Sequence, residues 1–195
     1  MFLEKSVSML KKVMNCDTIR TAKAMLGMKL ILSGENLGKI VETEAYLGTA
    51  DSACHSSNGR RSPKNESMYL SAGHWYVYQI YGYQMLNLVT RPKNIAEAVL
   101  IRALESPSGD VVSNGPGKLT RFCGISQNLD GKLIEESDLK IIHGKIPKKI
   151  CQRARIGVTC EDEWRNKPLC FYVKGNKHVS KVAKRELIED SDTWK

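Results

Sequence analysis

The stretch Lys39-Ile-Val-Glu-Thr-Glu-Ala-Tyr46, with Lys29 to Ser33 before it, decides the fold class. Both segments read as strands, and Gly34 to Gly38 separates them, so the pattern predicts a hairpin with glycine at both ends of its turn. Because side chains alternate along a strand, one face of the second segment carries Ile40, Glu42, Glu44 and Tyr46.

A helix is predicted just upstream of this hairpin. Asp17 is a suitable N-cap, and Gly27 supplies a stop. Between them, Ile19, Ala22 and Leu26 fall on one helical face. Residues 1–16 are expected to be a lead-in to this helix.

Downstream, the chain predicts further strands and one short helix. A polar, basic loop runs to Gly73, and its length favours a functional role over a plain connection. The expected strands are Trp75 to Ile80, Gln84 to Val89, Ala98 to Leu104, Arg155 to Thr159 and Leu169 to Val173. A helix is expected to open at Asn114-Gly-Pro-Gly-Lys118 and to end near Cys123.

These elements predict a mixed α/β fold with a central, mostly antiparallel sheet flanked by helices. The chain has 195 residues, 42% of them hydrophobic, and no linker or repeat divides it. We therefore expect one compact domain over 1–195, with a polar C-terminal tail at 180–195. Disorder along the whole length is excluded.

The charge balance points to an anionic partner. There are 30 Lys and Arg against 21 Asp and Glu, a formal charge of +9, and the pI is about 9.3. Such an excess is typical of proteins that bind nucleic acid. No stretch approaches the ~18 apolar residues of a membrane span. We expect a soluble cytoplasmic protein, associated with the nucleoid if the source is a bacterium.

The six cysteines contain no C-x-x-C pair, which favours reduced thiols. A zinc site remains a minor alternative, with spacings that fit no compact knuckle, built from Cys151, Cys160, Cys170 and His178. We expect neither a metal nor a cofactor.

Glu44 and Arg102 are unusual for a core. Glu44 shares a strand face with an aromatic ring, and Arg102 interrupts the apolar strand Val99-Leu-Ile-Arg-Ala-Leu104. A buried arginine needs an anionic partner, and Glu44 is a candidate. On this evidence a structural ion pair and a catalytic pair are equally good interpretations.

Tyr81 and the basic loop suggest contact with DNA. Tyr81 precedes a glycine at a strand break, where a ring can wedge between stacked bases or simply pack a turn. Arg60, Arg61 and Lys64 suit phosphate contacts, although a solvated charged loop has the same composition.

Six motifs occur in a fixed order along the chain. They are Glu44-Ala-Tyr46, Ala53-Cys-His55-Ser, Ser62-Pro-Lys-Asn65, Tyr76-Val-Tyr78-Gln-Ile-Tyr81-Gly, Arg102-Ala-Leu-Glu105 and Asn114-Gly-Pro-Gly-Lys-Leu119. In order and spacing these motifs resemble the alkyladenine (3-methyladenine) DNA glycosylase family. The similarity runs from about residue 17 to about residue 179.

This resemblance implies a monofunctional enzyme of base excision repair. Such an enzyme flips an alkylated or deaminated purine, such as 3-methyladenine, ethenoadenine or hypoxanthine, out of duplex DNA and hydrolyses its N-glycosidic bond. It leaves an abasic site without cutting the strand. The resemblance also implies a monomer with a topology similar to the C-terminal domain of methionyl-tRNA formyltransferases.

The resemblance assigns roles residue by residue. Glu44 matches the general base that activates the water, and Arg102 matches the residue that helps to hold it. The walls of the base pocket match Tyr46, His55, Tyr78 and Asn87. Tyr81 matches the intercalating wedge, and phosphate contacts are expected from Arg60, Arg61, Lys64 and Lys118.

Two other classes remain as alternatives. A non-catalytic nucleic-acid-binding module of the same fold shares the charge and the aromatic strand but needs no acid in the pocket. A formyltransferase-like domain that acts on a small substrate lacks a visible folate or nucleotide motif.

Overall fold

A computed structural model describes residues 17–195, apart from the side chain of Asp190. The strands are β1 (Lys29–Leu32), β2 (Glu35–Tyr46), β3 (Trp75–Ile80), β4 (Tyr83–Val89), β5 (Ala98–Glu105), β6 (Leu139–Ile142), β7 (Ile150–Arg153) and β8 (Cys170–Val173). The α-helices of the described part are α2 (Thr18–Ala24), α3 (Pro116–Phe122) and α4 (Asp190–Thr193). Short 3₁₀ helices are η1 (Gly48–Ala50), η2 (Ser57–Gly59), η3 (Glu66–Tyr69), η4 (Gln127–Leu129), η5 (Glu163–Arg165) and η6 (Lys184–Glu186). The expected mixed α/β class is confirmed.

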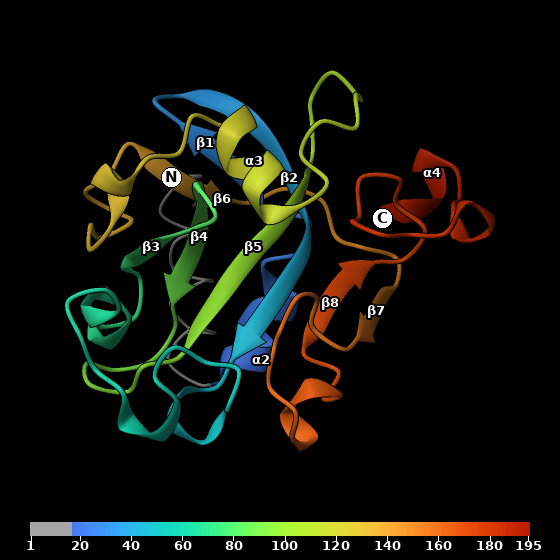
Figure 1. Cartoon of the computed structure of the whole chain (residues 1–195). Helices are drawn as coiled ribbons and strands as arrows, with labels where there is room; N and C mark the ends of the chain where they lie inside the picture. The colour runs from blue at the N-terminus through green and yellow to red at the C-terminus, as the bar shows by residue number, and fades with distance from the viewer. Residues whose placement is uncertain (1–16) are drawn as a thin grey trace.

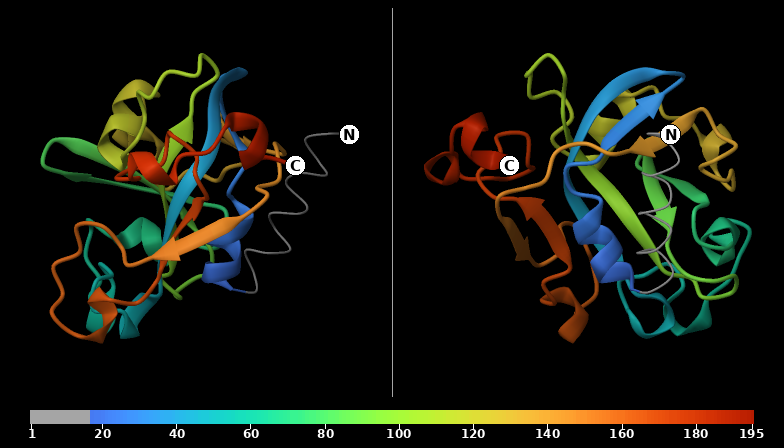
Figure 2. Two further views of the ribbon diagram at one scale, coloured as in Figure 1. Left: turned by 90° about the vertical axis from the view of Figure 1, so that its right-hand side faces the viewer. Right: turned by 180° about the vertical axis from the view of Figure 1, so that it is seen from behind.

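One antiparallel sheet contains all of these strands, in the order β3-β4-β5-β2-β1-β6. The short pair β7-β8 joins it because β8 also pairs with β2. The long strand β2 thus contacts β1, β5 and β8, and it crosses the middle of the molecule in Figure 1. Helices α3 and α2 lie on opposite sides of the sheet (Figures 1 and 2).

The β1–β2 hairpin is confirmed, but its turn is tighter than expected. Ser33 and Gly34 form it, both with positive φ, and β2 begins at Glu35. Gly38 lies inside β2 at φ 138°, where a Cβ would stand 2.4 Å from the Glu105 carbonyl oxygen. This glycine therefore permits close approach of β5 and does not end the turn.

Helix α2 forms as predicted and fixes which face of β2 points where. The Asp17 carboxylate accepts a hydrogen bond from the Arg20 amide at 3.0 Å and caps the helix. The Thr43 hydroxyl donates to the Ala22 carbonyl of α2 at 2.9 Å. Because neighbours alternate along a strand, Glu44 points away from α2, toward the other face of the sheet.

A small apolar cluster anchors the long loop between β2 and β3 to the sheet. Cys54, Met68 and Tyr69 of the loop pack against Tyr76 and other residues of the strands. The main core lies elsewhere in the sheet and includes Leu30, Ile40, Trp75, Leu88, Ile101 and Phe171. The loop is therefore packed against the sheet despite its polar sequence.

The C-terminal third contains the main corrections. The predicted strand Arg155 to Thr159 is wrong: the segment forms no strand, Gly157 has φ 79°, and the Arg155 side chain is buried. Alternation of Ile156 and Val158 reflects loop packing there and not a ladder. Strands β6 and β7 were missed; β7 is short, and its residues alternate between exposed and half-buried.

The polar tail contains a buried tryptophan. Trp194 lies almost fully buried, and its indole N–H donates to Glu105 Oε2 at 3.0 Å. The expected lead-in at 1–16 lies outside the described residues. No helix in the described part of the chain is long and apolar enough to cross a membrane.

Candidate active site

Glu44 and Arg102 meet on one face of the β2–β5 ladder. Arg102 Nη1 lies 3.2 Å from Glu44 Oε1, and both side chains are buried. Register irregularities flank Glu42 in the β2–β5 pairing, and Glu44 itself lies opposite Leu100. Arg102 is two residues from Leu100 on β5, so it shares a face of the sheet with Glu44.

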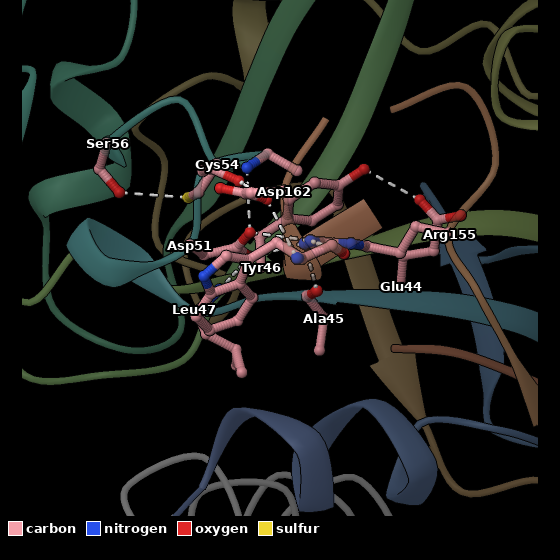
Figure 3. Close-up of polar contacts among 12 residues, drawn as sticks. Glu44, Ala45, Tyr46, Leu47, Asp51, Cys54, Ser56, Arg155 and Asp162 are labelled. Atoms are coloured by element: carbon pink, nitrogen blue, oxygen red, sulfur yellow. Dashed lines mark hydrogen bonds and ion pairs between the residues drawn. The ribbon is translucent and has the colours of Figure 1, made fainter. Parts of the chain in front are cut away.

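The Glu44 carboxylate is held by neutral donors as well as by Arg102. The Tyr46 hydroxyl donates to Oε2 at 2.9 Å (Figure 3). The Ile156 backbone N–H donates to Oε1 at 2.8 Å. Burial raises the pKa of Glu44 above its ordinary value, while Arg102, the Ile156 amide and Tyr46 pull it back down in part. A carboxylate in this position is suited to accept a proton.

Glu42 has a structural place beside this pair. Its side chain is fully buried, and it accepts hydrogen bonds from Arg153 and from the Ser180 amide, the latter at 3.0 Å. Arg102 Nε lies 3.7 Å away from Glu42 Oε1. Arg102 is therefore held between two carboxylates, of which only Glu44 contacts the tyrosine of the pocket.

An aromatic pocket of about 290 Å³ opens beside Glu44. It gathers all the side chains predicted for the base pocket together with the predicted wedge: Tyr46, His55, Tyr78, Asn87 and Tyr81. Glu44 and Arg102 are not among the lining residues; Glu44 lies one hydrogen bond behind Tyr46. The size and the flat walls suit a single planar ring system.

His55 is fixed by two tyrosines of β3. Its Nδ1 lies 2.7 Å from the Tyr76 hydroxyl oxygen, and its ring meets Tyr78 edge-on at 4.4 Å between centroids. Burial, helped by Arg60, lowers the pKa of His55, so the ring is neutral at pH 7. If Tyr76 donates to Nδ1, the ring presents an Nε2–H donor.

The tyrosines of the pocket stay protonated. Burial, followed by the nearby Glu44 charge, raises the pKa of Tyr78 to about 12 and that of Tyr46 well above its usual value. Their rings are therefore neutral, with electron-rich faces that attract cations and electron-poor rings.

Asn87 lies on β4, directly opposite Tyr76. Its amide nitrogen donates to the carbonyl oxygens of Tyr76 and Met85, at 3.1 and 3.0 Å. Both N–H groups are used in this way, which fixes the orientation of a buried amide in the pocket wall.

Tyr81 stands at the tip of the β3–β4 hairpin, which extends from the body of the molecule in Figure 2. Ile80 pairs with Tyr83, so Tyr81 and Gly82 form a two-residue turn, with φ of 49° and 78°. Its side chain is 92% exposed. A large residue in a left-handed conformation is strained, and such strain is concentrated at functional sites.

The basic residues differ in their surroundings. Arg60 and Lys64 are exposed and line a groove of about 550 Å³ that shares His55, Tyr76 and Tyr78 with the pocket. Arg61 instead forms a two-pronged ion pair with Glu66 and lies over the Tyr69 ring. Lys118 is exposed on α3, with its ammonium bonded to the Asn114 side chain at 3.0 Å.

Sequence reasoning missed one side of the pocket. Gly157, Val158 and Thr159 line it, and Asp51 and Arg155 form a buried pair close by. The available signal was Arg155 itself, because an arginine in a segment read as a strand needs an acidic partner.

No group of three or more His, Cys, Asp or Glu side chains that could hold a metal occurs between residues 17 and 195. The zinc alternative built on Cys151, Cys160, Cys170 and His178 therefore has no site there. Another cavity, of about 730 Å³, is lined by residues that include Gly38 of β2 and Lys145, and it shares no residue with the aromatic pocket.

A buried carboxylate and arginine behind an aromatic pocket, with cations at its mouth, are an arrangement suited to an enzyme that acts on a base of nucleic acid. A profile of the methylpurine-DNA glycosylase family matches residues 12–177. The chain belongs to the methylpurine-DNA glycosylase family, and the resemblance seen in its motifs is confirmed.

Bacterial relatives agree with this assignment. A protein of Staphylococcus carnosus (strain TM300), provisionally named a 3-methyladenine DNA glycosylase, is 45% identical over 93% of this chain and 97% of its own length. Proteins of the same name from Staphylococcus epidermidis (strain RP62A) and Staphylococcus aureus (strain JH9) are 41% and 37% identical, over 93% of this chain and 97% and 98% of their own. The chain is a DNA glycosylase that functions in DNA repair.

Proposed function

We propose that this protein removes damaged purines from double-stranded DNA by hydrolysis of the N-glycosidic bond. The substrates are 3-methyladenine, ethenoadenine and hypoxanthine, and the product is an abasic site in an uncut strand. The observation that carries the proposal is the buried Glu44–Arg102 pair, one hydrogen bond behind an aromatic pocket.

In this proposal Glu44 is the general base. Breaking the bond places positive charge on the sugar, and a carboxylate can both accept the proton of the attacking water and offset that charge. Glu44 is shielded from bulk solvent. Its water therefore enters with the extruded nucleotide, and Arg102 helps to hold that water beside the carboxylate.

The pocket selects the base by stacking. The neutral faces of Tyr46 and Tyr78 favour the electron-poor rings of alkylated purines, and neutral His55 offers a hydrogen bond to the base. Asn87 supplies a fixed amide in the wall. Damaged or mispaired bases also flip at lower cost, which adds to the selectivity.

The duplex is held at the hairpin tip and the basic groove. Tyr81 enters the space that the extruded nucleotide leaves, and Arg60, Arg61, Lys64 and Lys118 contact phosphates. We place the enzyme in the cytoplasm at the nucleoid, as a single-domain monomer without metal or cofactor. Its topology is that of the formyltransferase C-terminal domain.

A gel assay tests the function. A duplex with one hypoxanthine or ethenoadenine is incubated with the protein, and half of each sample is treated with alkali. Cleavage only after alkali supports a monofunctional glycosylase. Binding of the damaged duplex without any release supports the non-catalytic module instead, and strand cleavage without alkali contradicts the monofunctional mechanism.

A further inference from the structure

Asp51 and Arg155 form a buried ion pair beside the pocket. Arg155 Nη1 and Nη2 donate to the two Asp51 oxygens at 2.6 and 2.8 Å, and neither side chain is exposed to solvent. Removing two charges from water is costly even when they pair. A two-pronged pair is rigid as well as strong, so it is suited to hold neighbouring groups in place.

Arg155 contacts the two parts of the chain that hold Glu44. Its guanidinium lies over the Tyr46 ring, 4.7 Å from the centroid, and donates to the Ala45 carbonyl at 3.1 Å (Figure 3). The next residue, Ile156, donates its amide N–H to Glu44. Both neutral donors to the carboxylate, Tyr46 and the Ile156 amide, are thus tied to one side chain.

Asp51 extends the same contact to the loop that carries His55. Its oxygens also accept hydrogen bonds from the amides of Leu47 and Ala53, at 3.0 and 3.1 Å. The pair therefore joins three walls of the pocket: the end of β2, the loop after residue 51 and the segment after residue 155.

We propose that Arg155, held by Asp51, is a positioning residue for base release, which keeps Tyr46 and the Ile156 amide against the Glu44 carboxylate. This inference rests on the proposed function. Arg155 itself is buried, so it acts on the chemical step and not on the affinity for DNA.

The variants must separate positioning from folding. Arg155→Lys keeps the charge but loses the two-pronged contact and the flat face against Tyr46. Asp51→Leu with Arg155→Met removes both charges together, which avoids leaving one of them buried alone. Lys39→Met is the matched control. Lys39 lies on β2, the strand that carries Glu44, and it is the half-buried ion-pair partner of Glu105, away from the pocket.

Three measurements are compared after thermal unfolding shows that each variant is folded. The first is the affinity for lesion-containing duplex, and the second is the single-turnover rate of base release across pH. The third is the pKa of Glu44 without DNA, followed by the NMR chemical shift of its carboxyl carbon. We expect both Arg155 variants to release base at least tenfold more slowly, with affinity within about twofold of the parent.

We also expect the Glu44 titration and the acidic limb of the rate profile to move up together by about one pH unit in the double variant. The reason is that the Ile156 amide and the Tyr46 hydroxyl, no longer held in place, donate less well to the ionised carboxylate, which favours the protonated carboxyl. Lys39→Met should leave all three measurements unchanged.

A folded Arg155→Lys that matches the parent in rate, profile and titration overturns the inference. So does a uniform loss of rate with no change in the titration of Glu44. The NMR titration needs no turnover, so it tests the positioning even if the parent protein releases no base, a result that would refute the proposed function alone.

Discussion

Arg102 Nη1 stands 3.2 Å from Glu44 Oε1, with the two side chains 6% and 0% exposed. Such a pair is costly to bury, and a hydrophobic pair of similar size can be as stable. Its place behind an aromatic pocket fits the proposed role of Glu44 as a base, because the arginine favours the ionised carboxylate where burial favours the protonated acid.

Glu44→Gln should bind DNA containing ethenoadenine or hypoxanthine as tightly as the parent protein but release base at least ~10²-fold more slowly, since an amide cannot accept the proton of water. Single-turnover release and a binding titration on the same duplex measure the two effects. Release near the parent rate contradicts the assignment of Glu44 as the base.

The rate of base release should decrease as the pH is lowered, with an apparent pKa above the ordinary glutamate value of 4.5. Burial raises the pKa of Glu44, and only its ionised form is active. A cationic lesion such as 3-methyladenine is the right substrate, since its leaving group needs no further proton. An acidic limb with an apparent pKa of 4.5 or lower would show that Glu44 is not the titrating base.

The same pKa shift has a consequence for stability. The folded state binds the Glu44 proton more tightly than the unfolded state, so this group's contribution to stability decreases as pH rises from the unfolded pKa to the folded one. Glu44→Gln removes this pH-dependent contribution to stability. The difference in free energy of unfolding between variant and parent should therefore grow in favour of the variant over that window, measured by urea unfolding at several pH values.

Tyr81→Asn should stabilise the fold and impair repair. Asn-Gly is the preferred pair for a two-residue hairpin turn with positive φ, so relief of strain should add about 0.5–1 kcal/mol to the free energy of unfolding. Loss of the ring should weaken binding to damaged duplex and slow release. Thermal unfolding and single-turnover kinetics measure these, and Tyr81→Phe, which keeps a ring, serves as the control.

Lys64→Ala should weaken DNA binding more than Arg61→Ala, since Lys64 lines the groove and Arg61 is occupied by Glu66. Loss of one phosphate contact should also reduce the slope of log affinity against log salt by about 1. Fluorescence anisotropy across salt concentrations measures both quantities. Equal effects of the two substitutions would mean that the ion pair with Glu66 does not weaken the phosphate contact of Arg61.

Glu42→Leu should act on folding rather than on chemistry. It leaves Arg153 without its carboxylate partner and Arg102 with Glu44 alone, and breaking such a cluster costs about 3–5 kcal/mol. Urea unfolding measures this loss, with exposed Glu163→Leu as a control of little effect. A variant of normal stability but without base release would give Glu42 a chemical role.

Local patterns in the sequence determined the elements whose faces differ strongly in polarity. Alternation in β2 to β5, and the cap at Asp17, need only a few neighbouring residues to be recognised. The short strand β7 has no such contrast, because its side chains are exposed or half-buried. The segment from Arg155 to Thr159 was predicted to be a strand because its apolar residues alternate. It is a loop that lines the pocket.

The sequence by itself also determined the family, through motifs carried in order, and it placed Glu44 and Arg102 among residues unusual for a core. Only the tertiary structure decided what these residues contact. Strand register set Arg102 against Glu44, and packing of distant loops placed Asp51 on Arg155 and Glu66 on Arg61. Period and propensity act over a few residues, whereas the partner of a buried charge is fixed by contacts between segments far apart in the chain.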